Sequence, residues 1–277
     1  MIPESKQRMT NILHIWNTAG VGGFLSKYMD SVFDCFESFC IMRVKYDPFE
    51  LMAKGRVYSC NWFKWFLICL IAPSKYHIIH VHGYDRILPF LKILYPHKKI
   101  VLHYHGTEIR GNWATKRRFL YRLADKVIVS TPDLLKGAPP QVDYFPNPID
   151  YDLVNELKSP VKLDKAYHVD RYAVDLAKEY ATEIGKEMVI LDRDNHWLNH
   201  RKFLTELTSY AYYIDAKRDF NRKTMIEALS LTALEASYAG VIVVNWKGEL
   251  VKEFPSLHEK ERVCQALYRV YQEVLNG

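Results

Sequence analysis

The stretch "EALSLTALEASYAGVIVV" (residues 227–244) joins an apolar helical pattern to a β-branched run through a single glycine. A helix that ends at glycine and leads into such a run is typical of the repeating unit of a parallel α/β sheet. Two acids, Glu227 and Glu235, lie eight positions apart in a segment otherwise suited to burial. The stretch therefore predicts an α/β fold. The two carboxylates need an explanation of their own, because the segment is otherwise suited to burial.

The same alternation of strand and helix recurs along the chain. Predicted strands cover residues 11–16, 77–82, 100–104, 126–130 and 142–145, and then 166–169, 188–192, 210–214 and 241–245. Continuous apolar runs separated by helical patterns indicate buried parallel strands. Two such sets predict two Rossmann-like, doubly wound domains, residues 1–152 and 153–277, with a boundary after the turn-rich "FPNPID" (residues 145–150).

Composition narrows the class of protein. The chain has 277 residues, of which 49% are hydrophobic and 25% charged, as in soluble globular proteins. It has no apolar run of about 18 to 20 residues and no signal-peptide pattern, so we expect a cytoplasmic protein. The five cysteines follow no metal-ligand spacing and are expected to be reduced. A net charge of +6 favours an anionic ligand or surface.

Ligands of open α/β sheets bind beyond the carboxyl ends of the strands, so the residues that follow each strand are the candidates for function. After the first predicted strand comes "NTAGVGGFLSKYMD", where Gly22 and Gly23 open a helix. Glycines there allow a phosphate to approach free backbone amides. The alternative is tight packing of the helix against the strand. The spacing is not G-x-G-x-x-G, so no NAD site is predicted.

Four histidines, His80, His82, His103 and His105, lie in or after two predicted strands, in "HIIHVHG" and "IVLHYHGTE". No cysteine or aspartate completes a ligand set with them, so we expect no metal. His105 follows its strand directly and is the best candidate to touch a substrate. His80 and His82 are equally well explained as structural residues.

An aromatic segment, "NWFKWFLICLIAPSKY" (residues 61–76), is too short to span a bilayer. It predicts a core helix that covers one face of the sheet. In the alternative, its edge of Trp62, Trp65 and Phe66 meets a membrane surface or a lipid acceptor.

Basic residues gather at two predicted strand ends of the second half. Arg171 follows one strand, and a run that includes Lys217, Arg218, Arg222 and Lys223 follows another. Such a run is usually only solvated, but cations placed just before a helix are also suited to bind a diphosphate.

The two glutamates suggest how a ligand would lie. If the helix begins just after Glu227, a rise of 1.5 Å per residue places Glu235 about 12 Å further on, roughly the span from a sugar across a diphosphate to a ribose. The amides of Leu229, Ser230 and Leu231 would then face the phosphates, and each carboxylate would accept hydrogen bonds from hydroxyls. In the alternative, Glu227 is a first-turn acid that favours the helix dipole and Glu235 is an exposed helix residue.

These motifs together resemble retaining glycosyltransferases of the GT-B fold, family 4 type. The resemblance rests on the spacing of Glu227 and Glu235 ahead of "LEASYAGVIVV". It also rests on the glycine loop, "VHGYD", "HYHGTE", "ADKVIVST" and "FPNPID" in that order, and it covers nearly the whole chain.

The resemblance implies two domains that face each other across a cleft and an enzyme that transfers a sugar with retention of configuration. The donor would be a UDP- or GDP-sugar bound as substrate, and neither cofactor nor metal ion is expected. The acceptor would be a glycan, a lipid or a protein, with contact to the inner face of a membrane as one option and no nucleic acid partner.

The resemblance also assigns roles to residues. Gly22 and Gly23 would border the donor phosphates, His105 would approach the transferred sugar, Glu227 would hold the hydroxyls of that sugar, and Glu235 would hold the ribose. Other expected donor contacts are Arg171, Lys178, Ser230 and Leu231, with Arg222 and Lys223 near the phosphates. The chain departs from the family at Leu229 and Ser230, where Phe-Gly is usual, and Lys178 comes two positions late.

Two other functions fit the same sequence. A nucleotide-sugar epimerase on this architecture would need its own acid and base beside the anomeric carbon. A basic module that binds nucleic acid or an anionic membrane would need one continuous basic face and a strong dependence on salt. The sequence contains no motif for DNA or RNA recognition.

Overall fold

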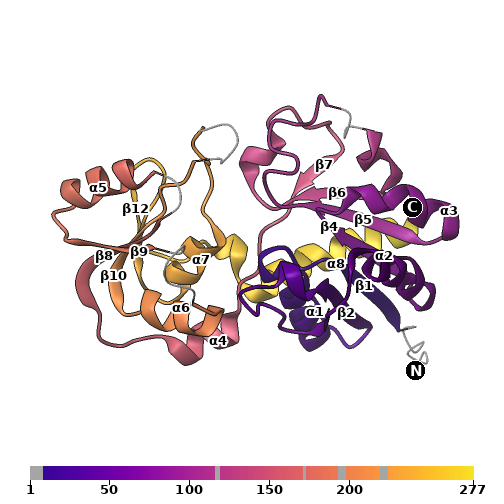
Figure 1. Cartoon of the computed structure of the whole chain (residues 1–277), viewed down its shortest axis with the longest axis horizontal. Helices are drawn as coiled ribbons and strands as arrows, with labels where there is room; N and C mark the ends of the chain where they lie inside the picture. The colour runs from indigo at the N-terminus through magenta and orange to yellow at the C-terminus, as the bar shows by residue number, and fades with distance from the viewer. Residues whose placement is uncertain (1–8, 116–118, 171–172, 193–197, 219–223) are drawn as a thin grey trace, which may run out of the picture. The chain divides into compact units, whose positions relative to one another are not determined.

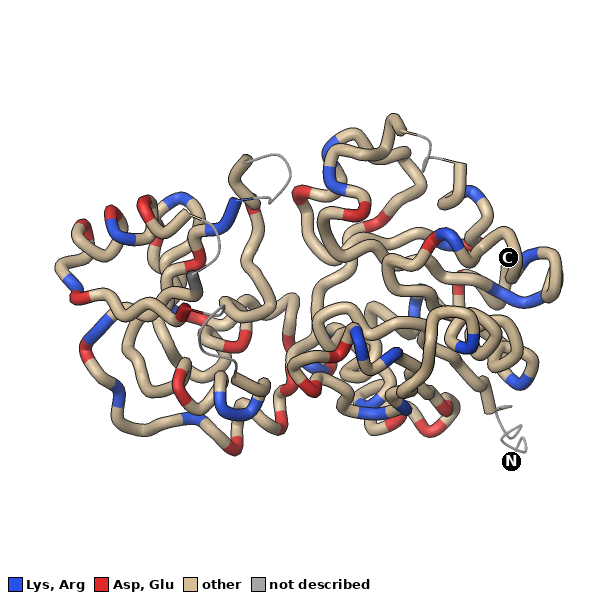
Figure 2. The backbone as a smooth tube through the Cα atoms, in the orientation of Figure 1, with Lys and Arg blue, Asp and Glu red and all other residues tan. Residues whose placement is uncertain are grey.

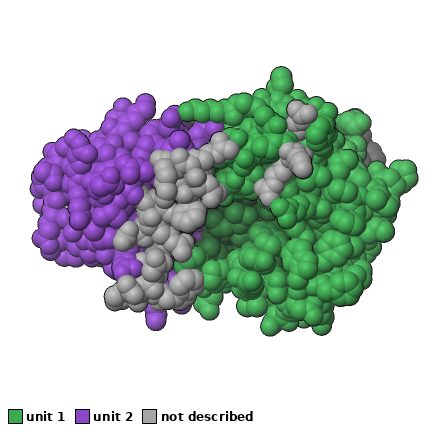
Figure 3. Space-filling view, turned by 45° about the horizontal axis from the view of Figure 1, so that its top comes forward, with its two compact units in different colours: residues 1–130, 134–146, 260–277 green, residues 131–133, 147–259 purple. Residues whose placement is uncertain are grey.

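The computed structural model describes residues 9–115, 119–170, 173–192, 198–218 and 224–277 (Figure 1). The chain forms two compact units, coloured separately in Figure 3. Unit 1 contains residues 1–130, 134–146 and 260–277, and unit 2 contains residues 131–133 and 147–259. Each unit is built on its own sheet.

The sheet of unit 1 has seven parallel strands in the order β3-β2-β1-β4-β5-β6-β7. They are β1 (Thr10–Ile15), β2 (Phe36–Arg43), β3 (Gly55–Tyr58), β4 (Ile78–His82), β5 (Lys99–Tyr104), β6 (Lys126–Val129) and β7 (Val142–Tyr144). The order reverses between β1 and β4. In doubly wound sheets this switch point is where ligands bind.

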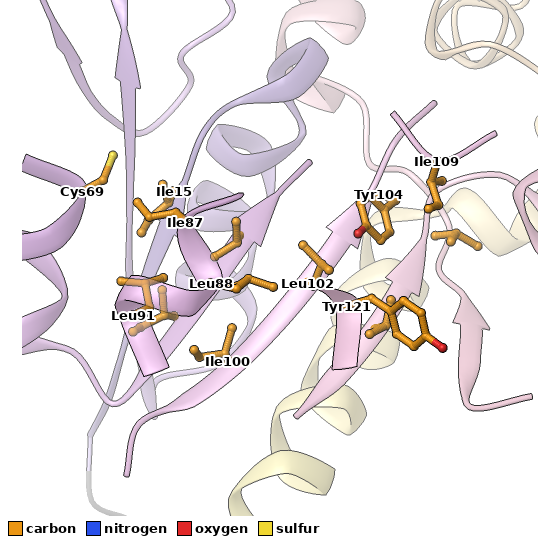
Figure 4. Close-up of a cluster of buried hydrophobic side chains, with 14 of the residues drawn as sticks. Ile15, Cys69, Ile87, Leu88, Leu91, Ile100, Leu102, Tyr104, Ile109 and Tyr121 are labelled. Carbon is orange, nitrogen blue, oxygen red and sulfur yellow. The ribbon is translucent and has the colours of Figure 1, made fainter. Parts of the chain in front are cut away.

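Helices cover both faces of this sheet. Trp65 and Cys69 of α2 (Trp62–Ile71) belong to one buried cluster with residues of β1, β4, β5 and α3 (Leu88–Leu94). Figure 4 shows Cys69 beside Leu88 and Leu91 of α3 in this cluster. The opposite face is covered by α1 (Val21–Val32) and α8 (Lys260–Asn276), which contact each other. The histidines of β1, β4 and β5 point to that second face, because side chains alternate along a strand.

The sheet of unit 2 has five strands in the order β12-β11-β10-β8-β9. They are β8 (Leu163–Asp170), β9 (Met188–Asp192), β10 (Tyr210–Ile214), β11 (Ile242–Val244) and β12 (Leu250–Val251), of which only β12 is antiparallel to its neighbour. Its helices are α4 (Tyr151–Leu157), α5 (Val174–Glu183), α6 (His200–Leu207) and α7 (Leu231–Tyr238). The switch point lies between β8 and β10.

The predicted α/β fold with two doubly wound, parallel-sheet units is confirmed. All nine predicted strands are present, and the structure adds β2, β3 and β12. The expected cleft between the two units stays a prediction.

The division of the chain differs from the expected boundary at residue 152. Residues 260–277, which include α8, belong to unit 1, where Leu267 and Tyr271 are fully buried. The chain therefore returns to its first unit after completing the second. An amphipathic helix buries its apolar face on whichever sheet offers a matching surface, and its sequence alone does not identify that sheet.

Candidate functional site

The carboxyl edge of the unit 1 sheet carries the glycine loop and His105. Gly22 and Gly23 lie in the buried first turn of α1, which follows β1 after a short 3-10 turn at Thr18–Gly20. A side-chain carbon on Gly22 would come within 2.8 Å of the Trp16 carbonyl oxygen and 3.0 Å of Cys40 Sγ. One on Gly23 would lie 3.0 Å from the Ala53 nitrogen. Close packing of α1 thus explains both glycines, and their contact with a donor stays a prediction.

A side chain of the loop already binds the first turn of α1. The amide of Gly23 donates to Asn17 Oδ1 at 2.8 Å, and Asn17 is itself buried. The N-cap of α1 is Gly20, and Asn17, which lies three residues before it, accepts from a first-turn amide where a phosphate was expected. The sequence signal for it was an asparagine directly after a strand and before a helix.

His105 lies where the sequence predicts it, directly after β5 and half-buried. Its amide donates to the carboxylate of Glu108, and its Nε2 shares a hydrogen bond of 3.0 Å with Nδ1 of His82. Burial lowers the pKa of His105 to about 3. The ring is therefore neutral near pH 7, and its tautomer is coupled to that of His82.

Four further histidines form a buried row beneath His105. His14, His80, His82 and His103 are all inaccessible to solvent, and neighbouring rings are stacked or tilted against each other at centroid distances of 4.4 to 5.5 Å. Burial lowers the pKa of His14 to about 3 and keeps the pKa values of the other three well below the ordinary range. All four are neutral near pH 7. His14 is the member that the sequence did not single out.

In unit 2, α7 begins at Leu231, three residues later than the start at residue 228 that was expected directly after Glu227. Ser230 caps the helix: its hydroxyl accepts from the Ala233 amide at 3.1 Å. The amide and hydroxyl of Ser230 both donate to the carboxylate of Asp215, at 2.8 and 2.7 Å. The expected start was wrong because a buried aspartate, fifteen positions earlier in the chain, fixes the cap.

Asp215 is the polar residue that the sequence analysis missed. It follows β10 directly, so it ties the amino end of α7 to the carboxyl end of that strand. Lys217 Nζ lies 3.4 Å from its carboxylate and offsets part of its charge. A diphosphate at this helix end would meet an anion that is already in place. The signal in the sequence was an acid directly after an apolar strand.

The two glutamates do not lie on one helix. Glu227 is exposed and precedes α7, whereas Glu235 is inside α7, only 2% exposed, with Oε1 3.1 Å from His200 Nε2 of α6. The separation of about 12 Å expected from helical rise therefore does not apply. The alternative of a first-turn Glu227 and an exposed Glu235 is also wrong. Burial of Glu235 agrees with the small residues around it.

The other predicted donor contacts divide into three groups. Ser230 and Leu231 lie at the start of α7 as described above, and Lys178 is exposed on α5. Arg171, Arg222 and Lys223 lie outside the described residues. Lys and Arg alternate with Asp and Glu along both units (Figure 2).

A groove of about 660 Å³ lies elsewhere on unit 1. Asp125 and Lys126 at the start of β6, and Asp143 of β7, line it. It lies toward the amino ends of these strands, away from the edge that carries His105. No described helix is long and apolar enough to cross a membrane.

Comparison with known proteins gives a likeness of fold only. The chain matches no protein-family model, and no curated protein matches it in sequence. Among solved structures it is similar to a UDP-N-acetylglucosamine 2-epimerase (TM-score 0.48, 11% identity, 96% of this chain and 90% of that one). The spinosyn forosaminyltransferase SpnP (0.46, 11%, 97% and 91%) and S. aureus MnaA with UDP (0.46, 11%, 96% and 90%) are also similar. Likenesses of this size do not identify an activity.

Proposed function

We propose that the chain binds a nucleotide-sugar in unit 2 and transfers its sugar to an acceptor hydroxyl with retention of configuration. One observation carries this proposal. Helix α7 contains Glu235 and follows Glu227. It begins at the switch point of the unit 2 sheet, because its cap residue Ser230 is bonded to Asp215 directly after β10. Doubly wound sheets bind phosphorylated ligands at this position.

The proposed roles follow from exposure and charge. Glu227 is exposed beside the helix start, so its carboxylate accepts hydrogen bonds from the sugar hydroxyls. Glu235 holds the ribose, for which it must share or release the contact with His200. Ser230, Leu231, Lys178, Arg171, Arg222 and Lys223 are the proposed contacts of the diphosphate. In this proposal the cations stabilise the leaving group. They also have to offset the charge of Asp215, whose carboxylate already accepts from the Ser230 amide at the amino end of α7.

His105 of unit 1 keeps its proposed contact with the transferred sugar. Being neutral, it can donate one hydrogen bond and accept another. No enzymatic nucleophile is proposed. The acceptor attacks on the face from which the diphosphate leaves, and the leaving phosphate takes the acceptor proton.

The test begins with binding. The unfolding temperature is measured with UDP, GDP, ADP and their sugar conjugates, because a ligand of the native state raises it. One nucleotide with its sugar conjugate is expected to stabilise the chain. The selected conjugate is then incubated with glycan, lipid and peptide acceptors, and the products are analysed by NMR. A retained anomeric configuration in the product supports the proposal, and epimerised donor supports the other enzyme.

Glu227→Gln provides the matched variant. We expect a loss of about 10- to 100-fold in kcat/KM, the size of a lost hydrogen bond to a charged group. Glu253→Gln removes another exposed acid of unit 2 and is expected to leave the rate unchanged. Equal rates in both variants would remove Glu227 from the site.

An apolar patch on unit 1 supports contact with a membrane. The α2–α3 apolar patch consists of exposed side chains of two adjacent helices, Phe63, Leu67, Ile71, Phe90, Ile93 and Leu94. Lys64 and Lys92 lie on the same helices, and Lys92 is paired with Asp125 at 2.9 Å. Apolar residues beside cations are suited to an anionic lipid surface. The expected core role of α2 holds for the buried Trp65 and Cys69, and Phe66, Ile68 and Leu70 also pack against that core. The alternative edge of Trp62, Trp65 and Phe66 is therefore wrong at Trp65, which is fully buried.

Flotation with vesicles of anionic and of neutral lipid tests this contact. Binding to anionic vesicles that weakens with salt is expected, and Phe63→Ser with Ile93→Ser should abolish it. Binding that survives in the double variant would contradict a role for this patch.

A further inference from the structure

The histidine row contains a group that the topology alone brings together. β1 lies beside β4 in the sheet, and His14 is the register partner of His80. His82 follows two positions later on β4 and so shares the same face. One ring nitrogen from each of the three lies within 4.8 Å of the other two. The sequence did not predict this group because His14 is more than sixty residues away from its partners.

The hydrogen bonds show which nitrogens point inward. His80 Nδ1 lies 2.8 Å from the Tyr271 hydroxyl, and His14 Nε2 lies 3.4 Å from the same hydroxyl. His82 Nδ1 is bonded to His105 Nε2. The inward atoms are therefore His14 Nδ1, His82 Nε2 and His80 Nε2. The first two are 2.9 Å apart, and His80 Nε2 has no hydrogen-bond partner among the described residues.

We propose that His14, His80 and His82 bind an imidazole-preferring transition-metal ion, zinc or copper, through these three inward nitrogens. Imidazole ligands suit both metals. Nitrogens placed tetrahedrally around zinc at 2.0 to 2.1 Å are about 3.3 Å apart. The pair at 2.9 Å needs to separate by only a few tenths of an ångström. The ion gives His80 Nε2 the partner that the protein does not supply.

The outward nitrogens match this arrangement. A histidine that binds a metal usually donates its other N–H to a fixed acceptor, which orients the ring. His14 and His80 would both donate to the Tyr271 hydroxyl, and His82 would donate to His105. One assignment of protons thus satisfies all three ligands. It leaves Nε2 of His105 as an acceptor and places the ion one imidazole away from the proposed sugar contact.

A second group of three, His82, His103 and His105, fits less well. Its nitrogens also lie within 4.8 Å of one another. Neither ring nitrogen of His103 has a partner among the described residues. If one bound the ion, the other would remain buried without an acceptor, so the orienting bond would be missing.

Metal content tests the proposal without reference to activity. The full chain is purified without a histidine tag, and its zinc and copper are measured by mass spectrometry. After treatment with a chelator, Zn²⁺ and Cu⁺ are titrated separately, and Co²⁺ is added as a spectroscopic probe. One equivalent of Zn²⁺ or Cu⁺ per chain is expected to bind tightly and to raise the unfolding temperature. Absence of a stoichiometric site for either ion would overturn the proposal.

Variants locate the ion. His80→Gln should abolish the stoichiometric site, whereas His103→Gln, on the same face of the sheet, should keep it. The reverse result would assign the ion to the second group and refute the first. Exposed histidines such as His77 and His97 are present in both variants and bind equally in each.

Tyr271→Phe covers the case in which His80→Gln does not fold. It removes one hydroxyl from α8 and preserves the ring packing. Loss of the shared acceptor is expected to weaken binding about 10- to 100-fold. Unchanged metal affinity in Tyr271→Phe would count against these three ligands in two cases. In the first, His80→Gln folds and keeps the metal site. In the second, His80→Gln does not fold.

Discussion

Gly22 illustrates how a residue expected at a ligand site is first required by packing. A side chain at this position would overlap the Trp16 carbonyl oxygen and press on Cys40. Neither neighbour is the free end of a flexible chain. Contacts this short force the first turn of α1 away from the sheet.

We therefore predict that Gly22→Ala lowers the free energy of unfolding by about 1 to 3 kcal/mol, the usual cost of overpacking. Urea unfolding followed by circular dichroism measures it. Gly106→Ala is the control, because its added carbon meets only ordinary contacts at 3.7 and 3.8 Å. Equal stability of the two variants would show that α1 adjusts without cost.

Glu235 poses the opposite problem, since it is buried but assigned to a ligand. If it holds a ribose, Glu235→Gln should weaken nucleoside diphosphate binding about 10- to 100-fold, the effect of losing a charged hydrogen bond. Titration calorimetry gives the dissociation constant, with Glu253→Gln as the control. A variant that loses stability but keeps its affinity would assign Glu235 to the contact with His200 alone.

At the scale of elements, α7 depends on a cap that lies outside its own segment. Ser230→Ala is expected to cost about 1 kcal/mol, as at other helix caps. Asp215→Ala should cost more, because Asp215 accepts from both the amide and the hydroxyl of Ser230.

A double-mutant cycle tests whether these two residues act together. The combined variant should be more stable than the sum of the single costs predicts, by about 0.5 to 3 kcal/mol, since both changes remove one shared interaction. As a control, Asp215→Ala is combined with Asn199→Ala, because Asn199 caps α6 and not α7. The losses of stability in this second pair should be additive. Additivity in the first pair would contradict the shared cap.

The predictability of each element reflects where its determinants lie. The nine expected strands are continuous apolar runs, so each can be recognised from its own residues without knowing which strands lie beside it. β2, which is second from the edge of the sheet, was missed because exposed and partly buried residues interrupt its apolar run. β3 was missed because it has only four residues and forms the edge strand. The start of α7 depends on the bond from Ser230 to Asp215, and rules based on local sequence do not predict contacts between residues fifteen positions apart.

The same distinction applies to the candidate site. His105 was placed correctly at the end of its strand, since that position follows from local pattern, whereas Glu227 lies before the cap of α7 and not at its first turn. The grouping of His14 with His80 depends on strand order, which the sequence does not state. The roles of these residues in catalysis stay predictions.

At the scale of the whole molecule, α8 tests the division into units. Leu267 lies in the last helix of the chain but is buried in unit 1. We predict that Leu267→Ala costs about 2 to 5 kcal/mol and accelerates hydrogen exchange in β1 and β5, not in β8 and β10. Leu234→Ala, in the core of unit 2, should show the reverse pattern. Faster exchange in unit 2 for the first variant would contradict the placement of α8.

The return of α8 also has a consequence for biosynthesis. A ribosome releases residues 147–259 before the helix that covers one face of the first sheet exists. During that interval the imidazoles of β1 and β4 lack the tyrosine that later orients them. The sheet of unit 1 therefore stays partly uncovered until α8 has been synthesised. During this period chaperones and soluble metal ions have the freest access to that sheet.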